Sequence, residues 1–128
     1  MVIKIQISDD DKTILDGELN DTETAKKIER ALPVKSDPRF WGNEIYFEIP
    51  VNIDDNENPE MGLEVGDLAY WPDGHAFCIF FGPTPGSTGT EPRPASPVTV
   101  VGEITGDAEV LQDLDLESVS EVRIEKSA

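Results

Sequence analysis

The sequence is poor in the residues that build several common kinds of functional site. Its 128 residues include one cysteine, one histidine and 10 Lys plus Arg, against 27 Asp plus Glu. One cysteine cannot form an intramolecular disulfide, and a single Cys with a single His does not furnish an ordinary zinc site. No phosphate-cradling, glycine-rich loop with a following Lys-Ser/Thr occurs, so nucleotide binding has no support. The sequence therefore predicts neither a metal nor a cofactor.

Positive charge is scarce over most of the chain. The formal net charge is −17, and Arg93 is the single base between residues 40 and 122, where 17 residues are acidic. This balance excludes binding to nucleic-acid phosphates and disfavours anionic lipid surfaces. The acidic excess indicates either general solubility, as in a salt-rich cytoplasm, or attraction of a cationic partner.

Long hydrophobic runs are also missing. No stretch is long enough to cross a bilayer, and no charged-then-apolar leader opens the chain. The length suffices for one domain with a real core but not for two. We therefore expect one soluble, cytoplasmic domain over residues 1–128, and the sequence does not indicate its oligomeric state.

Strand patterns dominate the chain. The alternation in 2–7, the Asp-rich turn at 8–11 and the return over 12–19 predict a hairpin. One helix is expected over 20–32, capped by Asn20 and ended by Pro33. Further strands are expected at 43–51, 67–71, 76–81, 98–104 and 119–124, with a helical turn near 108–113. About seven strands and one helix favour a mainly β fold closed into a barrel, because closure removes exposed edges.

The hairpin over 67–81 is the most apolar part of the protein. Its second strand is apolar on both faces, so we expect both faces to be covered. Cys78 lies in this strand and is expected to be a buried thiol with a raised pKa. The loop that follows, 82–97, contains three Gly and five Pro. A loop of this length is usually functional or disordered, and its prolines favour an ordered, extended conformation.

Two familiar kinds of site are excluded by position. His75 follows the Pro72-Asp73-Gly74 turn, and no nucleophile-elbow sequence surrounds a serine, so a Ser-His-Asp triad is not expected. The acidic run starting at Asp54 has proline where an EF-hand needs its sixth-position glycine, and valine where it needs its final glutamate. That run is a solvated acidic loop or a weak, irregular cation site.

Arginine and aromatic side chains are the candidate binding residues. Arg93 lies between two prolines, and its guanidinium suits either a ligand carboxylate or the protein's own Glu44 or Glu91. Arg39 has the same two interpretations. Aromatic residues line either the core or a pocket, where the polar tips of Tyr and Trp find partners. These aromatic candidates are Trp41, Tyr46, Tyr70, Trp71, Phe77 and Phe81.

Four sequence runs resemble those of the small cyclophilin-like barrel proteins of archaea and bacteria, which are largely uncharacterised. They are Trp41-Gly42-Asn43-Glu44-Ile45-Tyr46-Phe47-Glu48-Ile49-Pro50, Gly66-Asp67-Leu68-Ala69-Tyr70-Trp71-Pro72, Ala76-Phe77-Cys78-Ile79-Phe80-Phe81-Gly82-Pro83 and Arg93-Pro94-Ala95-Ser96. The resemblance covers nearly the whole chain and implies a closed cyclophilin-type β-barrel with one helix. Cyclophilins that isomerise prolyl bonds carry a Phe-His-Arg run and a Gln-Gly-Gly-Asp run, and this sequence has neither. No catalytic residue is therefore carried over.

Three functions remain open at this point. The first is a binding protein whose rim pocket, between hairpin 67–81 and loop 82–97, takes a small molecule or peptide. Arg93 would hold a carboxylate or carbonyl of that ligand. The alternative is a peptidyl-prolyl cis-trans isomerase with a divergent site, in which Arg39 or Arg93 stabilises the twisted amide. The third is a protein whose acidic surface docks a basic partner.

Overall fold

The computed structural model describes residues 1–8 and 12–127. Residues 9–11 of the predicted Asp-rich turn therefore lie outside the described residues. The described part is mainly β, with one α-helix and three 3-10 helices. The strands are β1 Val2–Ser8, β2 Lys12–Leu19, β3 Val34–Ser36, β4 Arg39–Phe40, β5 Glu44–Glu48, β6 Asp67–Trp71, β7 Ala76–Phe80, β8 Thr99–Ile104 and β9 Glu121–Lys126. The helices are α1 Glu23–Ala31, η1 Pro72–Gly74, η2 Ala108–Asp113 and η3 Leu116–Ser118.

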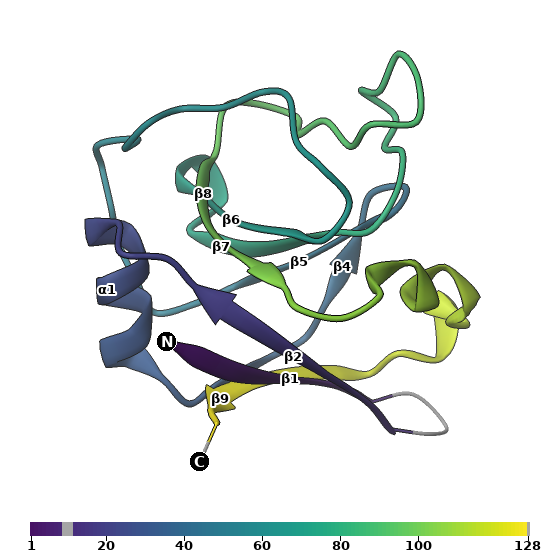
Figure 1. The fold of residues 1–128 in the computed structure, drawn as a ribbon, viewed down its shortest axis with the longest axis horizontal. Helices are drawn as coiled ribbons and strands as arrows, with labels where there is room; N and C mark the ends of the chain where they lie inside the picture. Colours follow the sequence, from purple (N-terminus) through teal and green to yellow (C-terminus); the bar gives the residue numbers. More distant parts are fainter. Residues whose placement is uncertain (9–11, 128) are drawn as a thin grey trace.

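The strands form one antiparallel sheet in the order β3-β9-β1-β2-β8-β6-β7-β5-β4. The sheet curls on itself (Figure 1) but remains an open half-barrel, so the predicted closure is wrong. The two end strands, β3 and β4, are three and two residues long. They are consecutive in the chain, and Asp37 and Pro38 lead from one to the other. The chain itself spans the gap, where Pro38 has no N–H to donate to a ladder.

Most predicted elements are present, with shifted boundaries. Strands β1, β2 and β6 lie where the sequence predicts them, whereas β5 is shorter and β9 begins later. The helix begins at Glu23 rather than near residue 20, because its cap is Thr22, whose Oγ1 accepts from the Ala25 N–H. Asn20 instead accepts from the Thr22 N–H and hydroxyl. The short strands β3 and β4 and the helix η3 were not predicted.

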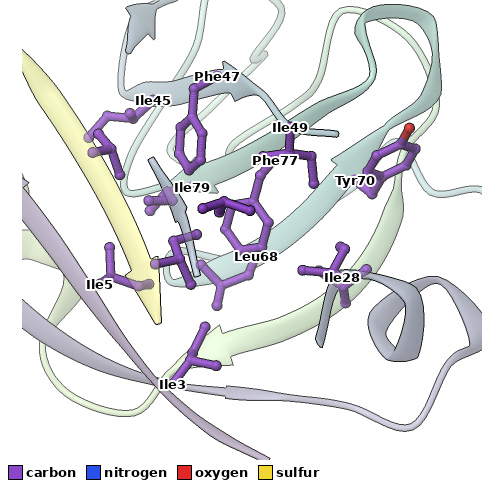
Figure 2. Close-up of a cluster of buried hydrophobic side chains, with 14 of the residues drawn as sticks. Ile3, Ile5, Ile28, Ile45, Phe47, Ile49, Leu68, Tyr70, Phe77 and Ile79 are labelled. Atoms are coloured by element: carbon purple, nitrogen blue, oxygen red, sulfur yellow. The ribbon is translucent and has the colours of Figure 1, made fainter. Parts of the chain in front are cut away.

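The interior of the curled sheet holds the main hydrophobic core. Alternate residues of the strands point into it, together with Ile28 of α1 (Figure 2). The rings of Phe47 and Phe77 stack there, with centroids 5.6 Å apart and an interplanar angle of 29°. The pleat therefore turns the intervening residues of β5, β6 and β7 toward the outside of the sheet.

A second, smaller cluster covers the outside of the same strands. It consists of Leu63, Ala69, Cys78, Phe80 and Val98, all buried. Leu63 belongs to the connection between β5 and β6, and Val98 follows loop 82–97, so both segments contribute to the cover (Figure 1). Every residue of β7 is buried, which confirms that both faces of this strand are covered.

Candidate functional site

Tyr46 and Trp71 meet on the outer face of the sheet, on either side of β7. Tyr46 pairs with Cys78 in register, and Trp71 pairs with Ala76. Their rings form an edge-to-face pair with centroids 6.0 Å apart and an interplanar angle of 83°. Beside this pair is a hollow of about 140 Å³, here called the outer pocket. Its lining residues are Trp41, Glu44, Tyr46, Trp71, Pro94 and Ala95.

Hydrogen bonds hold the loop wall of the outer pocket in place. The indole Nε1 of Trp71 donates to Ser96 Oγ at 2.6 Å, and Ser96 Oγ donates to Asp73 Oδ2 at 2.7 Å. Further along the loop, the Thr84 hydroxyl donates to the carbonyl oxygen of Arg93 and accepts from the Arg93 N–H. Pro94 and Ala95 lie between these two ties, so their backbone is positioned from both sides.

The turn before β5 positions Trp41 against the same loop. Gly42 has a φ of +60°, and a Cβ there would lie 2.8 Å from Pro85 and 2.9 Å from Thr84. Only glycine allows this backbone conformation and this close approach together. The Asn43 N–H also donates to the carbonyl oxygen of Pro83. The turn and the loop are therefore packed backbone to backbone where Trp41 enters the pocket wall.

Glu44 is the acidic residue of the outer pocket, and it is only 6% exposed. Burial raises the pKa of its carboxyl to about 7, and a hydrogen bond with the Cys78 thiol opposes that shift. The buried thiol has a pKa raised well above its usual value, by burial first and then by the nearby Glu44 charge. Within residues 1–8 and 12–127, no basic group lies within ion-pair distance of Glu44.

The sequence interpretation treated Glu44 only as a possible partner of Arg93. A usable signal was nevertheless present in the strands. Glu44 and Tyr46 share the outward parity of β5, and the neighbouring β7 is apolar on that face too. These patterns place Glu44 beside a covered face, but they do not separate it from Glu48, which has the same parity and is exposed. Pro94 and Ala95 of the loop, which line the pocket with Glu44, make the difference.

The structure divides the aromatic candidates between the two faces of the sheet. Tyr46, Trp71 and Trp41 line the outer pocket. Tyr70, Phe77 and Phe81 belong to the interior core, and Figure 2 shows Tyr70 and Phe77 there. The Tyr70 hydroxyl donates to the carbonyl oxygen of Val51. Tyr70 and Phe77 are therefore not brought to the pocket, because they have the opposite strand parity to Trp71 and Cys78.

The two arginine candidates lie outside the lining of the outer pocket. Arg39 is exposed on β4, in register with Tyr46, and lines an adjoining hollow that shares Tyr46 and Trp71 with the pocket. Arg93 is half-buried. Within the described chain its guanidinium forms no ion pair, neither with Glu44 nor with Glu91. The Arg93 backbone, by contrast, forms two hydrogen bonds with the Thr84 hydroxyl.

The acidic connection before β6 has a structural role. Glu57 accepts hydrogen bonds from the N–H groups of Glu23 and Thr24 and from the Thr24 hydroxyl. These bonds lower the pKa of the Glu57 carboxyl, the Thr24 N–H bond being the largest cause. Over the residues that are described, no group of three or more His, Cys, Asp or Glu is placed to hold a metal ion. None of the helices within residues 1–8 and 12–127 is long and apolar enough to span a membrane.

Comparison with known proteins agrees with this architecture. The cyclophilin-like family model matches residues 1–125. A solution structure of a hypothetical protein from Archaeoglobus fulgidus is similar, with 35% identity, a TM-score of 0.79, and coverage of 99% of this chain and 95% of that one. No curated protein matches the sequence significantly. The half-barrel, its single α-helix and these matches together show that the chain belongs to the cyclophilin-like family.

Proposed function

We propose that this protein binds a small molecule or peptide by taking one ring-sized apolar group into the outer pocket. The observation that carries the proposal is the pocket itself, a hollow with three aromatic walls and a buried carboxyl. Ligand sites are typically concave, mostly apolar and supplied with a few convergent polar groups. The pocket also lies between the hairpin and loop 82–97, where the sequence predicts a binding site.

The volume limits what can enter. A cavity of roughly 150 Å³ lined by apolar side chains accepts a benzene molecule. The outer pocket, at about 140 Å³, therefore suits one ring or a short branched group. The rest of a larger ligand would lie over Tyr46 and Trp71, toward the adjoining hollow that Arg39 lines. Arg39, rather than Arg93, is then the arginine available to a ligand carboxylate or carbonyl.

The protein's two tryptophans give a direct test, because both line the outer pocket. Phenol and N-acetylprolinamide, as ring-sized probes, are expected to shift the indole N–H signals of Trp41 and Trp71 saturably. Replacing exposed Ala95 by Phe should fill the pocket and abolish the shifts. Thr90→Phe, at an exposed loop position that does not line the pocket, is the matched control. Unchanged indole signals with both probes, or equal binding by Ala95→Phe, would contradict the proposal.

A divergent prolyl isomerase is the second candidate, and the position of Arg39 is what favours it. A pyrrolidine ring fits the pocket volume, and Arg39 lies just beyond the shared Tyr46 and Trp71. Positive charge beside a twisting amide would stabilise its transition state. A proline-peptide isomerisation assay separates the two functions. Isomerisation that is accelerated by the wild type but not by Arg39→Ala supports the isomerase. A peptide that binds but isomerises only at the uncatalysed rate supports a binding protein.

A further inference from the structure

We infer that the outer pocket recognises an organic cation, an alkylammonium or guanidinium head group, held by the Glu44 carboxylate and the faces of the aromatic walls. This inference rests on the proposed binding function and names the chemical class of its ligand. It depends on two separate features of the pocket: a buried acid without a charged partner, and an arrangement of electron-rich rings.

The first feature is the electrostatic state of Glu44. Its side chain is 6% exposed, yet none of the six lining residues is basic, and no ion pair involving it occurs in residues 1–8 and 12–127. Buried carboxylates are stable when they are paired, and costly when they are not. A cation brought by a ligand supplies the partner that the protein's own side chains do not.

The second feature is the composition of the walls. Trp41, Tyr46 and Trp71 surround the hollow, and the last two meet edge to face rather than stacked. An edge-to-face pair leaves ring faces available, and an aromatic face attracts a cation within about 6 Å of its centroid. Aromatic rings around a carboxylate bind a cationic ligand group better than a neutral ligand ring, because the neutral ring is not attracted by the charge of Glu44.

The surroundings add to the same preference. Asp73, an exposed residue of η1, accepts from Ser96, which itself accepts from Trp71, so a second carboxylate is bonded to the loop wall. Arg39, in the adjoining hollow, opposes this preference, but between residues 40 and 122 there are 17 acidic residues and the single base Arg93. A surface of this charge raises the local concentration of cations and repels anions. An approaching cation is therefore favoured before it reaches the pocket.

Choline and its neutral isostere 3,3-dimethylbutan-1-ol provide a matched pair of probes for the full-length protein. Each is titrated at constant ionic strength while the indole N–H signals of Trp41 and Trp71 are followed. We expect choline to bind at least about tenfold more tightly than the isostere, as a desolvated cation–π contact with an ion pair implies. Methylguanidinium, in a parallel titration, shows whether a planar cation is preferred.

Glu44→Gln keeps the shape of the side chain and removes its charge. It should weaken choline binding about tenfold and leave binding of the isostere within about twofold. Glu109→Gln, at an exposed residue of η2 that lines neither the outer pocket nor the hollow beside it, is the control and should change neither. Equal binding of the two probes, or choline binding unaffected by Glu44→Gln, overturns the cation inference while the binding function stands. If neither choline nor any neutral probe binds, both proposals fail.

Discussion

Trp71 and Ser96 join the central hairpin to the long loop through a chain of two hydrogen bonds. Trp71 Nε1 donates to Ser96 Oγ at 2.6 Å, and the same hydroxyl donates to Asp73 Oδ2 at 2.7 Å. One serine therefore fixes the orientation of an indole in the outer pocket and the position of the neighbouring loop wall. The proposed site depends on this tie as much as on the residues that line it.

Ser96→Ala is expected to loosen the pocket. It removes the acceptor of the Trp71 indole and the donor to Asp73, and we expect a loss of about 1–3 kcal/mol in the free energy of unfolding. The indole of Trp71 should also become more mobile, which broadens its N–H signal. Thr90→Ala, at an exposed loop position, is the control. A wild-type indole signal in Ser96→Ala would show that the hydrogen-bond chain does not orient Trp71.

The sequence predicted the elements of the fold better than its closure. Local residue patterns and turn signals depend on neighbouring residues, so β1, β2 and β6 can be predicted from the sequence. Closure depends on whether the two end strands pair. Here these are β3 and β4, whose three and two residues are too short to give a period-two signal. The gap between them is a property of the assembled sheet, which no local pattern contains.

The candidate site was predicted in part for a similar reason. Tyr46 and Trp71 were selected for their chemistry and do line the outer pocket, whereas Tyr70 and Phe77 face the interior. Parity within one strand separates residues into two sets but does not say which set faces inward when both faces are apolar. Strand β7 is buried on both faces, so its apolar sequence carried no such information.

Glu57 should stabilise the start of helix α1 from outside the helix. Its carboxylate accepts from the N–H groups of Glu23 and Thr24, which have no partners within the helix. We expect Glu57→Ala to lower the melting temperature, and Glu57→Gln, which keeps one acceptor oxygen, to lower it less. The folded-state pKa of Glu57 is lowered, so its contribution is present above the unfolded pKa and is lost as the pH falls through the folded pKa.

The control for Glu57 is Asp55→Ala, which removes an exposed acid from the same connection. Melting temperatures of the three variants and the wild type, measured at neutral and at strongly acidic pH, check the prediction. Equal melting temperatures for Glu57→Ala and Asp55→Ala would show that the contacts with α1 contribute nothing measurable.

Glu103 lies directly opposite two other acids in the sheet. It pairs in register with Glu18 on β2 and with Asp67 on β6. Burial is the first cause of the raised pKa of Asp67, and the Glu103 charge is among the others. Like charges at opposed positions are destabilising, so Glu103→Gln should stabilise the protein by roughly 0.2–1 kcal/mol at low salt. Denaturant unfolding with and without 1 M NaCl, at which the gain should shrink, measures the effect.

The matched control for Glu103 is Glu109→Gln, which removes an exposed acid from η2. It changes the net charge equally without touching the row of opposed acids. If both variants gained the same stability, the cause would be the overall charge of the protein and not the register of β2, β8 and β6.

Glu44 should make stability depend on pH across the neutral range. Its carboxyl has a pKa of about 7 in the folded protein, well above its ordinary value. Between the unfolded and folded pKa values the folded state binds more protons, so the free energy of unfolding falls as the pH rises. With about 1.4 kcal/mol for each pKa unit, the loss by pH 8 is on the order of 3 kcal/mol relative to pH 4.

Glu44→Gln should remove this slope and be more stable than the wild type at pH 8, whereas Glu48→Gln, exposed on the same strand, should retain it. Chemical denaturation at pH 5, 6, 7 and 8 tests this directly, and parallel profiles for Glu44→Gln and the wild type would mean that the carboxyl is solvated in the folded protein.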